Sequence, residues 1–444
     1  MPKILLINPP CSALYSKLRR ISPIYPPLGL LYLASFLEKN NVDVAFYDGL
    51  AEGRSVSDVE KILSVSDAEI VGITCTTSTL NEAIQIATYA KHWGKRTFLG
   101  GPHVTALPKL TLEKHPCFDV GVIGEGEITL RELIAGKPLN EIDGIVYRHD
   151  GEVVMNKARE AIEDLSSLPH PARHHLKNQL YQPGIKEYAR ANNFFTLITA
   201  RGCPFQCIFC ASKAIWGCRV RERSLEDIFL ELEELKGMGM TYLRVLDDTF
   251  TLKKSRVREF CKYIKNYNIH WSCNARVDRM DSEIIHMLKD SHCVFVEYGI
   301  ESGNQKILDI MKKGITLEQI RQAARVTKEA GMRFNCSFIV GNIGETLKTA
   351  EETVQLAKEL NPDFAQFNML TPYPGTEVYS ICKEKGYLIK DFEDYRNPKY
   401  QDPVIALPGL PAKELKKLLM HAYRYFYWRP QAIFKLLYHT IFFK

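Results

Sequence analysis

The stretch that decides the fold is Arg201-Gly202-Cys203-Pro204-Phe205-Gln206-Cys207-Ile208-Phe209-Cys210. Its three cysteines have the spacing Cys-x3-Cys-x2-Cys and directly follow an apolar run, Thr196–Ala200, that has the length of a strand. A loop this short brings three thiolates around one side of an iron–sulfur cube, and three ligands leave one iron open to an external chelator. The spacing therefore predicts a [4Fe–4S] cluster on Cys203, Cys207 and Cys210.

The rival for these cysteines is structural zinc, which takes four protein ligands and leaves no open position. Cys218 lies eight residues beyond Cys210 and is the nearest candidate for a fourth ligand. However, Trp216 and Gly217 precede it, the basic run 219–223 follows it, and it has no Cys-x2-Cys partner. The pattern favours the iron–sulfur cluster over zinc.

Downstream of the triplet, short apolar runs alternate with helical patterns as far as about residue 370. One helix start is clearly marked, because Ser224 can cap a helix and Asp227 follows three residues later. Six strand–helix units predict a partial, TIM-like (β/α)6 barrel with its chemistry at the carboxyl ends of the strands. The expected strands are Thr196–Ala200, Tyr242–Asp247, His270–Asn274, Val294–Gly299, Arg333–Val340 and Phe364–Met369.

Upstream, the first 135 or so residues show the same alternation. It predicts an α/β domain with a doubly wound, Rossmann-like parallel sheet, which binds ligands beyond the carboxyl ends of its strands. The expected strands are Ile4–Asn8, Val42–Tyr47, Ile70–Thr74, Thr97–Leu99 and Val120–Ile123, and the expected helices include Leu28–Asn40 and Leu80–Trp93.

Four of these strands end in loops of small or rigid residues, which let the backbone approach a large flat ligand closely. The loops are Asn8-Pro9-Pro10, Thr76-Thr77-Ser78-Thr79, Gly100-Gly101-Pro102-His103 and Gly124-Glu125-Gly126-Glu127. We interpret them together as a binding edge rather than as four unrelated turns.

The triplet, and the strand ends that follow it in register, resemble the radical SAM superfamily. The matching segments are Val245–Phe250, Tyr298–Gly303, Phe338–Glu345 and Pro372–Thr376. In that family the open iron binds the amino and carboxylate groups of S-adenosylmethionine (SAM), and one electron from the cluster cleaves SAM to a 5′-deoxyadenosyl radical. The resemblance implies SAM contacts at Phe209, Asp247, Asp248, Glu301, Ser302 and Gly341, although Asn342-Ile343 replaces a Leu-Pro pair that many relatives carry.

With an α/β domain ahead of the barrel, the chain resembles the cobalamin (B12)-binding radical SAM family, which includes methyltransferases and anaerobic magnesium-protoporphyrin cyclases. The resemblance implies cobalamin contacts at Asn8, Pro9, Thr77, Ser78, Gly100, Gly101, His103, Thr105, Gly124, Glu125 and Gly126. The sequence contains no Asp-x-His-x-x-Gly motif, which in many cobalamin domains supplies the lower cobalt ligand. We therefore expect His103 to be a loop histidine bonded to backbone.

The predicted domains are 1–137 for B12 binding, 138–190 as a linker with a hairpin, 191–400 as the radical SAM core and 401–444 as a helical region. The linker also contains His174-His175. No acidic or cysteine cluster lies near this pair in the sequence, so we interpret the two histidines as solvated loop residues.

The leading functional hypothesis is methylation of an unactivated carbon. One alternative keeps both cofactors but closes or rearranges a ring without methyl transfer. Another, from a different class, is a cobalamin-responsive regulatory protein with a structural metal. The expected partners are a small-molecule or lipid-like substrate and an electron donor such as flavodoxin or ferredoxin.

The composition indicates the cellular compartment in which the protein is expected. Its 444 residues are 45% hydrophobic and 25% charged, it carries 12 cysteines, and it has no signal-like start and no membrane-spanning apolar run. We expect a cytoplasmic protein with free thiols. The net charge of +6 lies in the segment from Lys413 onward, which has seven basic residues and one acidic residue. The rest of the chain is balanced in charge, which argues against a general nucleic-acid surface. This aromatic tail either contacts a membrane peripherally or packs on the barrel, and we favour packing.

Overall fold

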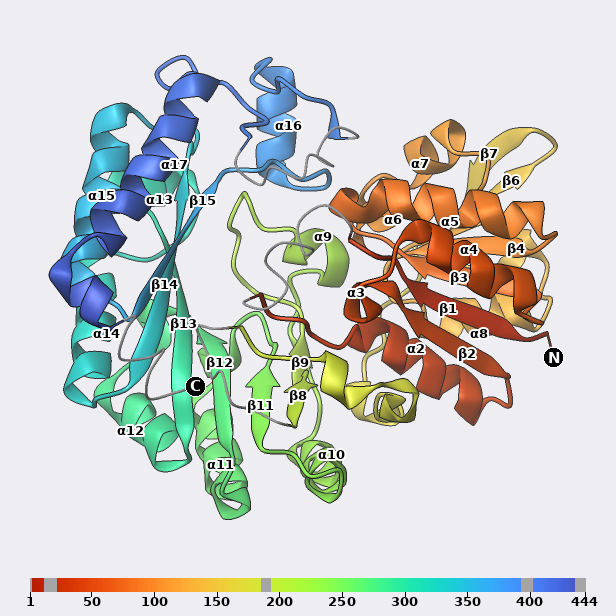
Figure 1. Ribbon diagram of the computed structural model, residues 1–444, viewed down its shortest axis with the longest axis horizontal. Helices are drawn as coiled ribbons and strands as arrows, with labels where there is room; N and C mark the ends of the chain where they lie inside the picture. The colour runs from red at the N-terminus through yellow and green to blue at the C-terminus, as the bar shows by residue number, and fades with distance from the viewer. Residues whose placement is uncertain (1, 12–21, 185–192, 393–401, 436–444) are drawn as a thin grey trace. The chain divides into compact units, whose positions relative to one another are not determined.

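The computed structural model describes residues 2–11, 22–184, 193–392 and 402–435 (Figure 1). It divides into two compact units. Unit 1 comprises Met1–Tyr181, Ala214–Gly217 and Phe392–Tyr400, and unit 2 comprises Gln182–Lys213, Cys218–Asp391 and Gln401–Lys444.

Unit 1 is built on a seven-stranded sheet with the order β2-β1-β3-β4-β5-β6-β7. Its first five strands form the predicted doubly wound parallel sheet, and their order is 2-1-3-4-5. The strands are β1 (Ile4–Asn8), β2 (Val44–Asp48), β3 (Ile70–Thr74), β4 (Arg96–Gly100), β5 (Val120–Val122), β6 (Ile145–His149) and β7 (Glu152–Met155). The helices are α2 (Leu28–Lys39), α3 (Gly49–Glu52), α4 (Val56–Val65), α5 (Leu80–His92), α6 (Pro102–Ala106), α7 (Pro108–Lys114) and α8 (Glu127–Ile134), with short 3-10 turns η1 to η5 at Thr77–Thr79, Leu139–Glu141, Leu165–Ser167, Arg173–His175 and Asn178–Leu180.

The sheet of unit 1 is buried on both faces, because successive side chains of a strand point to opposite sides. Ile4 and Leu6 of β1 join one core with α2 and α8, whereas Leu5 and Ile7 join a second core with α4 and α5. Figure 1 shows these two helix pairs on opposite sides of the sheet. The continuous apolar run in β1 follows from this double burial.

The predicted hairpin forms as β6 and β7, with Asp150 and Gly151 at positive φ in its turn. Its place in the fold differs from the expected linker, because β6 pairs antiparallel with the edge of β5 and extends the sheet of unit 1. The predicted boundaries at residues 137 and 190 stay predictions.

Unit 2 contains a six-stranded parallel sheet with the order β15-β14-β13-β12-β11-β8, which forms the expected partial barrel. The strands are β8 (Phe194–Leu197), β11 (Tyr242–Val245), β12 (His270–Ala275), β13 (Cys293–Glu301), β14 (Arg333–Val340) and β15 (Phe364–Met369), with a small pair β9 (Ala200–Arg201) and β10 (Arg221–Glu222). The helices are α9 (Ser212–Trp216), α10 (Leu225–Gly237), α11 (Lys254–Ile264), α12 (Ser282–Asp290), α13 (Gln305–Ile310), α14 (Leu317–Glu329), α15 (Leu347–Leu360), α16 (Glu377–Glu384) and α17 (Ala412–Tyr427), with 3-10 turns η6 to η8 at Phe250–Leu252, Lys265–Tyr267 and Val277–Arg279. Ser224 caps α10 as predicted, by accepting from the backbone N–H of Asp227.

The strand expected at Thr196–Ala200 is divided, because β8 ends at Leu197 and β9 begins at Ala200. The backbone N–H of Thr199 donates to the buried carboxylate of Asp247 over 2.6 Å, and the Thr199 hydroxyl donates to the same carboxylate. These bonds hold the chain out of the sheet just before the cysteine loop.

The free edge of β15 is covered by tyrosines of α17. The hydroxyl of Tyr427 accepts from the backbone N–H of Ala365 and donates to its carbonyl, at 3.1 and 2.9 Å. Tyr423, one helical turn earlier, bonds Phe367 in the same way. Exposed edge strands invite aggregation, so this cover protects the barrel. The preference for packing is thereby confirmed for α17, and within the described residues no helix is long and apolar enough to cross a membrane.

We expect Tyr427→Phe to lower the free energy of unfolding by about 1–3 kcal/mol. The substitution removes the hydroxyl that bonds both the N–H and the carbonyl of Ala365 at the edge of the sheet. The matched control is Tyr425→Phe on the same helix, whose exposed hydroxyl bonds Gln355 at 3.1 Å. It should cost no more than about 0.5 kcal/mol. Urea unfolding of the two variants tests this, and equal losses would contradict the role assigned to the Tyr427 hydroxyl.

Candidate active site

A cavity of about 250 Å³ in unit 2 gathers the three predicted cluster cysteines. It lies at the carboxyl ends of the barrel strands, where TIM-like folds place their chemistry. Six of the predicted site residues line it together, namely Cys203, Cys207, Phe209, Cys210, Asp248 and Glu301. The other lining residues were not among the individual site residues predicted, although Thr249 and Gly299 lie in matching segments. They are Phe205, Ser212, Lys213, Thr249, Asn274, Ala275, Arg276, Glu297, Gly299, Lys313 and Ser337.

The cysteine loop is fixed at both ends. Gly202 has φ +99°, and a side chain there would collide with the carbonyl oxygen of Arg219, so only glycine fits. Ile208 is buried between the second and third cysteines. Its N–H donates to the carbonyl of Met311 over 3.0 Å, and its own carbonyl accepts from the N–H of Val378 over 3.0 Å. These contacts anchor the cysteine loop on its surroundings in unit 2.

Burial disfavours the thiolate forms of Cys207 and Cys210 before a cluster binds. Burial raises the pKa of Cys207, against the opposing effect of Lys313 and Arg276, and burial raises the pKa of Cys210 to about 11. Binding of a cluster must therefore release the thiol protons. Cys218 does not line the cavity, and its sulfur accepts from the amide of Gln206 at 3.4 Å. Three sulfur donors facing one cavity fit a [4Fe–4S] cluster with one open iron.

Two basic residues frame the cavity. Lys313 forms a buried ion pair with Glu301, with 2.7 Å between Nζ and Oε1. Arg276 donates to the backbone carbonyl of Lys313 at 2.9 Å, and its guanidinium lies 3.4 Å from the centre of the Phe205 ring. The cavity thus offers cations and a carboxylate beside the cysteines, a donor set that fits the amino and carboxylate groups of SAM. Neither Arg276 nor Lys313 follows from a sequence motif, because both stand on irregular segments between elements.

The barrel interior beneath the cysteines is polar. Glu297 accepts from Arg244 and Asn335, each at 3.1 Å, and from Ser337 at 3.3 Å. Asn274 lies beside Glu297 in the strand register and accepts from Arg244. TIM-like barrels usually fill this space with branched apolar side chains. A signal for Glu297 existed in the sequence, since it interrupts the apolar strand at an alternate position, as Glu301 does.

Three residues implied as SAM contacts do not line the cavity. Asp247 is buried and binds Thr199 and Ala200, and its burial raises its pKa to about 6. The hydroxyl of Ser302 lies 3.3 Å from that of Thr353 on α15. Gly341 has φ +86° and donates its N–H to Glu345. These residues shape the strand ends in this structure, and their contacts with SAM stay predictions.

Glu345 holds the loop after β14 and should make the stability of the protein depend on pH. Burial raises the pKa of Glu345 to about 7, although the N–H groups of Gly341 and Asn342 donate to its carboxylate. The folded state then binds the proton more tightly than the unfolded state. Unfolding free energy should therefore fall by up to about 3 kcal/mol as pH rises from 4.5 to 7.

We expect Glu345→Gln to remove this part of the pH dependence, because the amide has no proton to lose. Urea unfolding of the wild type and the variant at pH 5 and pH 8 measures the difference. The wild type should lose stability relative to the variant as the pH rises, and parallel pH profiles would show that Glu345 does not titrate in this range.

In unit 1, the residues implied as cobalamin contacts stand at or just beyond the carboxyl ends of β1, β3, β4 and β5. These strands are parallel, so their ends share one edge. Several of the residues bond one another or their neighbours. The pairs are Asn8 with Asp48 (2.8 Å), Ser78 with Thr76 (2.9 Å), Thr105 with both Gly101 (2.9 Å) and Gly124 (3.0 Å), and Glu125 with Ile162 (2.8 Å), while Pro9 is buried and Gly126 precedes α8.

His103 differs from the expected loop residue. It lies in α6, its side chain is buried, and its Nδ1 is 3.2 Å from the hydroxyl of Thr77. Its ring also packs 5.5 Å from that of Phe392. The physical reason is that α6 begins at Pro102, so the position falls within a helical turn rather than in a loop.

The glycines of this edge fit a large flat ligand. At Gly100 and Gly124 a side chain would meet open space, so the backbone itself forms the surface. At Gly101, with φ +97°, a side chain would come within 2.8 Å of the Cys75 backbone. The residues present are thus compatible with cobalamin, and the individual contacts stay predictions.

Comparisons with known proteins agree with both units. Residues 197–357 match the family model described as the radical SAM superfamily, and residues 18–134 match the B12 binding domain. An uncharacterized methyltransferase of Pyrococcus horikoshii is 37% identical across 98% of this chain and 94% of its own length. The anaerobic magnesium-protoporphyrin IX monomethyl ester cyclase of Rubrivivax gelatinosus is 30% identical, covering 91% of this chain and 74% of the cyclase.

A solved structure shares the fold over 87% of this chain. The radical SAM methyltransferase TsrM of Kitasatospora setae, with cobalamin and a [4Fe–4S] cluster bound, superposes with a TM-score of 0.71 at 19% identity, over 87% of this chain and 75% of TsrM. The matched domains, together with a relative 37% identical along nearly the whole chain, show the family. This chain belongs to the B12-binding radical SAM enzymes, a family that includes cobalamin-dependent methyltransferases and anaerobic magnesium-protoporphyrin cyclases and whose cofactors are a [4Fe–4S] cluster, SAM and cobalamin.

Proposed function

We propose that this enzyme methylates an unactivated carbon of a small-molecule substrate. The observation that carries the proposal is that one chain combines the three-cysteine cavity of unit 2 with the open glycine edge of unit 1. The methyltransferase relative from Pyrococcus supports methyl transfer over ring closure, since it is more similar to this chain than the cyclase is.

The cofactors supply the reactive chemistry, namely removal of a hydrogen atom from a C–H bond and delivery of a methyl group. The chain's own residues would hold these cofactors and orient the substrate. Cys203, Cys207 and Cys210 would bind the cluster, and Lys313 with Arg276 would bind the carboxylate of SAM.

The polar barrel interior would orient the substrate. The Glu297 side chain is 29% exposed and lines the cavity. Three side chains, those of Arg244, Asn335 and Ser337, donate to its carboxylate and hold it in place. A carboxylate fixed in this way accepts from a hydroxyl, amide or amine of a bound molecule without losing further side-chain entropy. We infer that the substrate carries such a donor close to the carbon that reacts.

Several finer assignments belong to this proposal. We infer a cytoplasmic location, a flavodoxin or ferredoxin as electron donor, and no nucleic-acid partner. The C-terminal residues 436–444 lie outside the described residues, and a peripheral membrane contact through them would suit a lipid-like substrate. Liposome flotation of the full chain against a truncation after residue 435 tests that contact, and equal flotation would remove it.

Label transfer tests the proposal directly. The reconstituted enzyme, loaded with cobalamin, is incubated anaerobically with a reductant, a small-molecule cell extract and SAM that carries a trideuterated methyl group. Mass spectrometry should find a product that has gained the labelled methyl group. Release of 5′-deoxyadenosine with no label in any product would instead support ring closure or rearrangement.

A further inference from the structure

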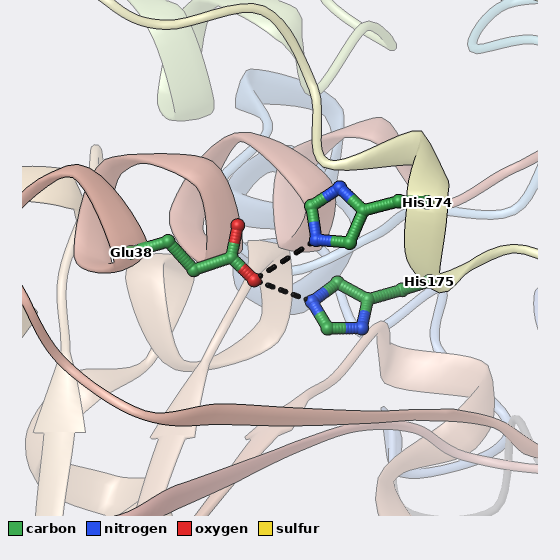
Figure 2. Close-up of side chains that lie close together, drawn as sticks. All are labelled: Glu38, His174 and His175. Carbon is green, nitrogen blue, oxygen red and sulfur yellow. Dashed lines mark hydrogen bonds and ion pairs between the residues drawn. The ribbon is translucent and has the colours of Figure 1, made fainter.

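Glu38, His174 and His175 of unit 1 form a cluster that sequence spacing does not reveal. The two histidines lie in η4, and Glu38 stands in the last turn of α2, more than 130 residues earlier. Figure 2 shows both imidazole rings directed at one carboxylate oxygen. The interpretation as solvated residues holds for His174, which is 64% exposed, but not for His175, which is 19% exposed. The fold also supplies an acidic partner that the neighbouring sequence lacks.

The ligand atoms lie near the separation that a small cation requires. Oε1 of Glu38 lies 3.1 Å from Nε2 of His174 and 2.7 Å from Nε2 of His175. All three residues offer ligand atoms within 4.8 Å of one another. In a tetrahedral zinc site with bonds of about 2.0–2.1 Å, neighbouring ligand atoms are about 3.3 Å apart. A cation therefore requires only small shifts of these three side chains.

The cluster is held by its surroundings and remains open to solvent. The backbone N–H of Ala172 donates to the carbonyl of Leu31 in α2 at 3.0 Å, so η4 is tied to the helix that carries Glu38. His175 is 19% exposed, and its ring lies 5.9 Å from that of Phe46. His174 is 64% exposed, which leaves a path for a cation to enter.

We propose that this cluster binds a divalent cation of the zinc class through Nε2 of His174, Nε2 of His175 and one oxygen of Glu38. Two imidazoles and one carboxylate favour zinc and its transition-metal neighbours over magnesium or calcium, which prefer oxygen ligands. Three protein ligands leave a fourth position for water or a small anion. The cation would fasten η4 to the end of α2, and it is separate from the three cluster cysteines.

The test uses the tag-free holoenzyme, because its iron–sulfur cluster occupies the cysteines that would otherwise capture zinc. Equilibrium dialysis against zinc measures the stoichiometry and Kd, and zinc K-edge absorption identifies the ligand atoms. The variants are His174→Ala, His175→Ala and Glu38→Gln. The matched control is His149→Ala, which removes another exposed histidine of unit 1. The Nε2 atom of His149 lies 3.5 Å from the carboxylate of Asp150.

We expect one zinc per chain with only nitrogen and oxygen ligands, at about 2.0–2.1 Å. His174→Ala, His175→Ala and Glu38→Gln should each weaken zinc binding by on the order of 100-fold. Loss of a metal ligand should cost at least as much affinity as loss of a residue that hydrogen-bonds to a ligand. His149→Ala should bind as the wild type does. No bound zinc, sulfur ligands at about 2.3 Å, or unchanged binding in the three variants would each overturn the proposal. In every variant, an unchanged absorption of the iron–sulfur cluster shows that the protein has folded.

Discussion

Replacement of Cys207 by alanine should abolish both the iron–sulfur cluster and SAM cleavage, whereas Cys218→Ala should leave both intact. Cys207 lines the cavity with the other two cysteines, and Cys218 does not. A cluster with only two cysteine ligands loses its anchorage on the protein. We therefore expect 5′-deoxyadenosine formation by Cys207→Ala to fall to background.

The matched pair also separates iron–sulfur chemistry from zinc binding. Iron and sulfide content, together with a broad absorption near ~400 nm that dithionite bleaches, report the cluster. If Cys218→Ala lost as much iron as Cys207→Ala, a four-cysteine site would be indicated. The cavity would then have no open iron for SAM.

The second large effect is expected at Lys313. Its ion pair with Glu301 is buried, with side chains only 8% and 9% exposed. Lys313→Met leaves the Glu301 carboxylate without its partner, and such a loss costs about 3–5 kcal/mol. Urea unfolding should show this decrease, and the variant should also raise the KM for SAM if Lys313 binds the SAM carboxylate.

Two controls isolate the buried pair. The adjacent Lys312 forms an exposed pair with Glu377, whose side chains are 53% and 46% exposed, so Lys312→Met should cost no more than about 1 kcal/mol. The double variant Lys313→Met with Glu301→Gln should recover part of the lost stability, because no buried charge remains unpaired. Equal losses in Lys312→Met and Lys313→Met would contradict the importance of burial.

Local patterns were sufficient to predict the strands of both units. Ile4–Asn8, Ile70–Thr74, Arg333–Val340 and Phe364–Met369 form with the predicted bounds. Each is an apolar run bounded by turn residues, so its signal lies wholly within the segment. The strand before the cysteines was less predictable, since its break depends on Asp247, which lies almost fifty residues further on.

The site was predictable only where its residues sit in motifs. The cysteine triplet and Glu301 stand at fixed positions beside strand ends, and the cavity unites them. Lys313 and Arg276 reach the cavity from irregular segments, whose path depends on tertiary packing. The pairing of Glu38 with His175 could not be predicted for the same reason. No local sequence pattern connects the end of a helix to a turn so distant in the sequence.

The most direct measurement is the pair of SAM by-products released by the cobalamin-loaded holoenzyme. With reductant and small-molecule extract, radical methylation consumes one SAM for hydrogen removal and another as the methyl source. We expect 5′-deoxyadenosine and S-adenosylhomocysteine in comparable amounts, and neither above background from the extract alone. 5′-Deoxyadenosine without S-adenosylhomocysteine would contradict methyl transfer as the function of this enzyme.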